Sequence, residues 1–119
     1  MLKLNAEQLQ AVEHGEGPLL VIAGPGSGKT RVITQRIVHL LGAVPGSEPR
    51  LGPRNILALT FTEKAAGEMQ ARVKQALPAL EESPRISTFH AFCYHLLRQR
   101  HFDRRLLDPV DVWIFLRRR

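Results

Sequence analysis

The chain has 119 residues, of which 44% are hydrophobic and 24% are charged, the size and composition of one globular domain with a modest core. Its longest apolar run, residues 19–23, is too short for a membrane span of about 20 residues, and no secretory signal opens the sequence, so we expect a cytoplasmic protein. The single cysteine excludes an internal disulfide, and the net charge of +6 favours a polyanionic partner.

The first part of the sequence has the pattern of a helix, a strand and a second helix. Asn5 and Gln8 have the spacing of a capping box, which predicts a short helix ending near Gly15. The apolar run at residues 19–23 is bounded by Gly-Pro pairs, as is typical of a strand buried on both faces of a parallel sheet. Apolar residues then recur at helical spacing over residues 28–41.

The second part of the sequence repeats this alternation. Residues 42–54 contain three prolines and three glycines, which predicts a surface connection without a regular element. Residues 56–60 form a second apolar run, and Thr62 can cap a helix over residues 63–77. A third, weak strand is predicted at residues 85–88, and an apolar stripe at helical spacing predicts a helix from there to about residue 100.

The order of these elements, β-α-β-α-β-α behind a leading helix, predicts an α/β fold. Such an order gives a parallel sheet with right-handed crossovers and helices on its faces. Three strands leave the edges of the sheet unprotected, and residues 112–119 form an apolar cluster without a partner segment after it. We therefore expect an incomplete fold in a chain that is a fragment of a longer protein.

The segment AGPGSGKT lies between a predicted strand and a predicted helix, the context of a phosphate-binding loop. Its glycines let backbone N–H groups face an anion at the amino end of the helix. Lys29 supplies positive charge for the β- and γ-phosphates and Thr30 a hydroxyl for magnesium, so both are expected to be catalytic. The alternative is a glycine-rich turn followed by a chance Gly-Lys-Thr. The residues expected to bind the nucleotide here are Ala23, which replaces the usual opening glycine, Gly24, Pro25, Gly26, Ser27, Gly28, Lys29 and Thr30.

Four ordered segments resemble motifs of the UvrD/Rep/PcrA group of superfamily 1 DNA helicases. The resemblance implies a RecA-like P-loop NTPase domain, of which residues 1–101 are the amino-terminal part and residues 102–119 the start of an inserted helical subdomain. It also implies an ATP- and magnesium-dependent helicase that acts on single-stranded DNA with 3'-5' polarity, in DNA repair, replication or recombination. The four segments are LNAEQLQAV at residues 4–12, AGPGSGKT at 23–30, LALTFTEKAAGEM at 57–69 and ISTFHAFCYHLLR at 86–98.

The same resemblance implies roles for individual residues. Gln8 reads the adenine edge and Arg31 flanks the adenine. Phe61 follows a predicted strand at the edge where open α/β sheets bind ligands, and its ring can stack on a base. Hydroxyl, ammonium and imidazole donors near this edge suit a phosphate backbone. The residues expected to bind DNA are Phe61, Thr62, Lys64, Thr88 and His90.

Several of these residues have a purely structural alternative. Phe61 and Phe89 can be core aromatics, and Phe89 is left out of the DNA-binding set because it continues the apolar stripe of its helix. The remaining alternatives are helix capping for Gln8 and Thr62, a solvated side chain for Lys64, a helix-start position for His90, a solvated helix face for residues 117–119, and core positions for Cys93 and Trp113.

Parts that ATP hydrolysis requires are missing from the sequence. The only aspartates are Asp103, Asp108 and Asp111, and none follows an apolar strand as a Walker B acid does. A second RecA-like domain is also needed, so the chain alone is expected to be inactive. Three alternatives to the helicase stay open at this point: a helicase-nuclease of the RecB or AddA type, a P-loop nucleotide kinase, and a non-catalytic nucleotide-binding module.

Overall fold

The computed structural model describes residues 3–42, 51–100 and 117, and divides the chain into two units, Met1–Phe89 and His90–Arg119. Within the described residues, no helix has the length and apolarity needed to cross a membrane. The predicted apolar cluster at residues 112–119 lies outside the described residues, apart from Arg117. The elements in chain order are α1 (Ala6–Glu13), α2 (Lys29–Leu40), the 3-10 turn η1 (Pro53–Asn55), β1 (Leu57–Thr60), α3 (Glu63–Ala76), β2 (Arg85–Thr88) and α4 (Phe89–Gln99).

The leading helix α1 begins with the predicted capping box. The Asn5 side chain accepts a hydrogen bond from the Gln8 amide at 2.8 Å, and the Gln8 Oε1 accepts one from the Asn5 amide at 3.0 Å. The carboxyl end of α1 is held by α2, because one guanidinium nitrogen of Arg36 lies within hydrogen-bond distance of the carbonyls of Ala11, Val12 and His14, the residue that follows α1, at 2.9 to 3.1 Å. These contacts attach α1 firmly to the helix that follows the predicted phosphate loop.

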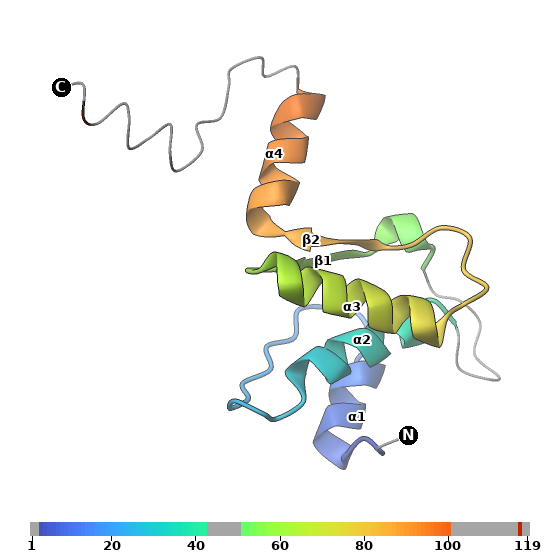
Figure 1. Ribbon diagram of the computed structural model, residues 1–119. Helices are drawn as coiled ribbons and strands as arrows, with labels where there is room; N and C mark the ends of the chain where they lie inside the picture. The colour runs from blue at the N-terminus through green and yellow to red at the C-terminus, as the bar shows by residue number, and fades with distance from the viewer. Residues whose placement is uncertain (1–2, 43–50, 101–116, 118–119) are drawn as a thin grey trace. The chain divides into compact units, whose positions relative to one another are not determined.

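The two strands and α3 form a β-α-β unit, as the sequence predicted. β1 and β2 are parallel, and their register pairs Leu57 with Arg85 and Thr60 with Thr88. Helix α3 connects them and lies between the sheet and α2 (Figure 1). Its apolar residues recur every three to four positions, so one face of the helix enters the core. The buried core of this unit consists of Ile37, Ile56, Ala66, Met69, Val73 and Ile86.

The predicted strand at residues 19–23 is not formed. Leu20 is 84% exposed and Ile22 is 90% exposed, and among the described residues no backbone group of 19–22 pairs with another. A strand exists only when a neighbour accepts and donates its hydrogen bonds. The described part of the chain holds no such neighbour for this segment. The apolar pattern therefore predicted a strand, but the described residues do not form it.

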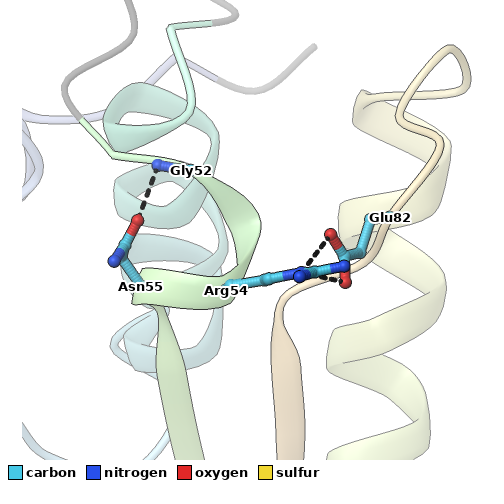
Figure 2. A network of polar contacts seen from close by, with 4 residues as sticks. All are labelled: Gly52, Arg54, Asn55 and Glu82. Atoms are coloured by element: carbon cyan, nitrogen blue, oxygen red, sulfur yellow. Dashed lines mark hydrogen bonds and ion pairs between the residues drawn. The ribbon is translucent and has the colours of Figure 1, made fainter.

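The connection before β1 also differs from the prediction, because residues 53–55 form the short turn η1. The Gly52 amide donates to Asn55 Oδ1 at 3.2 Å, and the Arg54 side chain forms an ion pair with Glu82, 2.7 Å between Nε and Oε1 (Figure 2). The ion pair joins the connections that precede β1 and β2. Both side chains are exposed, so it contributes little to stability.

Replacing Asn5 with Ala is expected to lower the free energy of unfolding by about 1 kcal/mol, because α1 loses the side-chain acceptor at its start. Asn5→Asp keeps an oxygen at the same place and should unfold close to the wild-type urea concentration. Urea denaturation followed by circular dichroism measures both variants. Equal losses in the two variants would show that the cap does not stabilise this helix.

Candidate functional site

Residues 23–30 form a tight loop that enters helix α2. The Gly24 carbonyl accepts hydrogen bonds from the Ser27 amide at 3.3 Å and the Ser27 hydroxyl at 2.6 Å, which closes the turn. Gly26 has φ +72° and Gly28 has φ +82°, in the left-handed region that favours glycine. Two of the three glycines named from the sequence are therefore required by backbone conformation, while Gly24 is not among the glycines with positive φ.

The start of α2 presents backbone donors without acceptors. Gly28 provides no side-chain cap, and among the described residues no acceptor is found for the amides of Gly26, Lys29 or Thr30. The first turn of any helix leaves such amides unsatisfied, and aligned peptide dipoles add positive potential there. The loop thus has the backbone donors that could hold an anion.

Two side chains add charge and a hydroxyl to this site. The Lys29 ammonium donates to the carbonyls of Ala23 at 3.0 Å and Gly24 at 2.7 Å, and within the described residues it pairs with no carboxylate. Its positive charge is therefore not neutralised. The half-buried Thr30 hydroxyl has no hydrogen bond to any described residue. That oxygen can serve as one protein ligand to a magnesium ion that arrives with a nucleotide, the other ligands being phosphates and water.

Gln8 connects α1 to the loop. In addition to its capping bond, its Nε2 donates to the Ser27 carbonyl at 3.0 Å. A side-chain amide has two donor hydrogens and two acceptor lone pairs, so one of each is still available for an adenine edge. A Cβ at Gly28 would lie 3.2 Å from Gln8 Nε2, so this contact also depends on glycine at position 28.

The structure adds one residue that the sequence analysis did not name. Arg72, from α3, lines a pocket together with six consecutive residues that run from Gly26 to Arg31. The pocket volume is about 310 Å³, at the lower end of the range of ligand pockets. The only sequence signal for Arg72 was its place in a helix predicted to cover the sheet, which does not by itself indicate a ligand.

The carboxyl end of the sheet carries a pair of aromatic rings. Because Thr60 pairs with Thr88, the next residues along the two strands, Phe61 and Phe89, are also neighbours. Their ring centroids lie 5.3 Å apart with 33° between the planes. Phe61 is 84% exposed and Phe89 is 42% exposed, so neither is a core aromatic, and the prediction of a core position for Phe89 is wrong. The register of the sheet decides this, because it places both rings beyond the strands.

The polar residues predicted for this edge differ in exposure. Thr62 caps α3 by accepting from the Ala65 amide at 3.1 Å, yet it is exposed and its hydroxyl hydrogen can still be donated. Lys64 is also exposed. Thr88 is only 4% exposed and its hydroxyl donates to Glu63 at 3.0 Å. Thr88 shares the buried face of β2 with Ile86, so a contact from Thr88 to DNA requires this hydrogen bond to break.

The residues after Phe89 belong to the second unit. His90 lies in the first turn of α4 and is exposed. Cys93 is exposed as well, so the core position predicted for it is wrong. No residue of α4 is buried, because the described residues of this unit provide no further element to cover its apolar stripe. Trp113, predicted to be in the core, lies outside the described residues.

Replacing Gly28 with Ala is expected to destabilise the chain by about 1–2 kcal/mol through its left-handed backbone, with a further loss from the Gln8 contact. Gly26→Ala has the same backbone cost but no atom within 4 Å of the new Cβ, so its loss should be smaller. Gly24→Ala should be nearly neutral. Urea denaturation gives the ranking, and an equal effect at all three positions would contradict the described loop conformation.

Comparison with known proteins identifies the family to which these features belong. The chain is 47% identical over 116 residues to the ATP-dependent DNA helicase PcrA of Staphylococcus epidermidis strain RP62A. The aligned region covers 91% of this chain and 15% of that relative. PcrA of Staphylococcus aureus strain Mu50 is 46% identical, with the same coverage. The chain thus spans about 15% of the length of the curated relatives it matches. Because residues 4–113 match the model of the UvrD/REP helicase N-terminal domain, the chain belongs to this family, whose fold is that of P-loop NTPases.

Proposed function

We propose that this chain is the ATP-binding, amino-terminal part of an ATP-dependent DNA helicase or translocase that moves along single-stranded DNA with 3'-5' polarity. Residues 1–101 form the first part of a RecA-like domain, and residues 102–119 begin an inserted helical subdomain. The proposed activity serves DNA repair, replication or recombination in the cytoplasm. Family membership and the names of the PcrA relatives support the helicase class.

The observation that carries the nucleotide part of the proposal is the start of α2. Amides without acceptors, an ammonium without a carboxylate partner and a hydroxyl without a hydrogen bond converge there among the described residues. A magnesium nucleoside triphosphate would suit all three groups: the amides and Lys29 would hold its phosphates, and the Thr30 hydroxyl would be a ligand for the metal. Lys29 would then have to leave the carbonyls of Ala23 and Gly24.

The DNA part of the proposal rests on the carboxyl edge of the sheet. The Phe61 ring is exposed to solvent, and stacking on an exposed ring holds a base of any sequence. Thr62 and Lys64, both exposed, follow it in the first turn of α3 and suit phosphate oxygens. His90 and Thr88 complete the proposed set, Thr88 only after its hydroxyl leaves Glu63.

Hydrolysis and movement require more than these residues supply. Within the described residues no cluster of three or more His, Cys, Asp or Glu side chains could hold a metal ion, so magnesium is proposed to arrive with ATP. The acid that activates water and the arginines that stabilise the transition state belong to the rest of the helicase, including its second RecA-like domain. We accordingly propose that residues 1–119 alone do not unwind DNA.

In the full-length protein, Lys29→Ala is expected to lower the turnover of ATP in the presence of single-stranded DNA by about 100-fold or more, because the β- and γ-phosphates lose their fixed positive charge. A phosphate-release assay measures the rates. Lys3→Ala removes an exposed lysine far along the chain from the loop and serves as the control. Turnover that is the same with and without single-stranded DNA would favour a nucleotide kinase or another P-loop protein over a motor.

Phe61→Ala is expected to weaken binding of the full-length protein to single-stranded oligonucleotides by about 5- to 100-fold, the loss expected for one stacked base. Phe61→Tyr keeps the ring and should bind like the wild type. Lys64→Gln should instead reduce the steepness of the salt dependence, by about 0.7 in the slope of log K against log salt. Fluorescence anisotropy across a salt series measures both effects, and unchanged binding by Phe61→Ala would remove the ring from the proposed interface.

A further inference from the structure

The packing of α3 against the core fixes the position of Arg72 on that helix. Its neighbour Val73 is the most deeply buried large side chain of the described core, and Met69, one helical turn before Arg72, is also buried. The backbone of α3 is therefore held firmly at this point. Arg72 itself is exposed and emerges beside the buried stripe, on the side where α3 packs against α2.

Two adjoining pockets share this arginine. The first contains the loop residues that run from Gly26 to Thr30, together with Arg31 and Arg72. The second contains both arginines again, with side chains from α2 and from the end of α3. Neither pocket is lined by an aspartate or glutamate, so Lys29, Arg31 and Arg72 concentrate positive charge in one concave region. The residues of the second pocket are Arg31, Thr34, Gln35, Arg72, Gln75 and Ala76.

Two other arginines of the same unit, Arg36 and Arg54, are held by groups of the protein itself. Arg36 donates to three backbone carbonyls and Arg54 is paired with Glu82. Arg72 has no hydrogen bond or ion pair within residues 3–42 and 51–100. An exposed arginine of this kind is usually only solvated. Arg72 differs because it faces the same pocket as the amides of the loop that have no acceptors.

We propose that Arg72 binds the phosphate chain of the nucleotide, as a second cation supplied by a different element from the one that carries Lys29. The inference rests on the proposed nucleotide-binding function and adds a residue to it. A guanidinium donates two parallel hydrogen bonds to a phosphate, and such charge-assisted bonds are stronger than neutral ones. A fixed cation on α3 also means that bound nucleotide bridges α2 and α3.

The test compares Arg72→Gln with Lys74→Gln in the full-length protein. Lys74 is an exposed cation of the same helix that lines neither pocket, so it controls for the loss of one positive charge. Isothermal titration is expected to show a dissociation constant for Mg·ATPγS raised about 5- to 20-fold by Arg72→Gln and unchanged by Lys74→Gln. Arg72→Lys, which keeps the charge and loses the fork, should fall between them.

Adenosine separates a phosphate contact from a contact to the base or sugar. Its affinity should be the same for wild type and Arg72→Gln, and an equal loss for adenosine and Mg·ATPγS would overturn the proposal. Equal Mg·ATPγS affinity for Arg72→Gln and wild type overturns it too, while the nucleotide-binding function stands if Lys29→Ala still abolishes binding. If the wild-type protein binds no nucleotide, both the Arg72 proposal and the proposed nucleotide-binding function are contradicted. Circular dichroism melts establish that each variant is folded.

Discussion

The backbone amides at the start of α2 are the constraint on which the site depends. A helix cannot satisfy its first N–H groups internally, and here no side chain caps them because Gly28 precedes the helix in a left-handed conformation. The loop is held in this form by the Gly24 carbonyl and by Gln8, whose amide joins α1 to Ser27. Among the described residues these donors have no protein acceptor, so they are available to an external anion.

Helix α3 connects the proposed DNA-binding edge of the sheet with the proposed nucleotide-binding loop. Its first turn follows Phe61 at the edge of the sheet, and its third turn brings Arg72 to the pocket lined by residues 26–31. The buried stripe of Ala66, Met69 and Val73 packs α3 between α2 and the strands, so packing constrains the backbone of the helix along its length. The proposed nucleotide and DNA sites are therefore attached to the same helix.

The exposed apolar run at residues 19–22 has no neighbouring strand among the described residues. Leucine, valine and isoleucine side chains of this kind are normally removed from water, and a central strand is buried by neighbours on both sides. The curated relatives are several times longer than this chain, since it covers 15% of their length. Among the described residues, only β1 and β2 form the sheet, and neither pairs with this run.

Local patterns in the sequence determined the helices, the two observed strands and the glycine turn at residues 23–30, because caps, apolar spacing and glycine act over a few residues. Asn5, Thr62 and the run from 85 to 88 are examples that the structure confirms. Only the tertiary structure decided which distant residues meet. Parallel register placed Phe89 beside Phe61 and buried Thr88, and the packing of α3 on α2 brought Arg72 to the loop. Strand formation failed at 19–23 for the same reason: hydrogen-bond partners come from the fold, whereas hydrophobicity is a property of the segment.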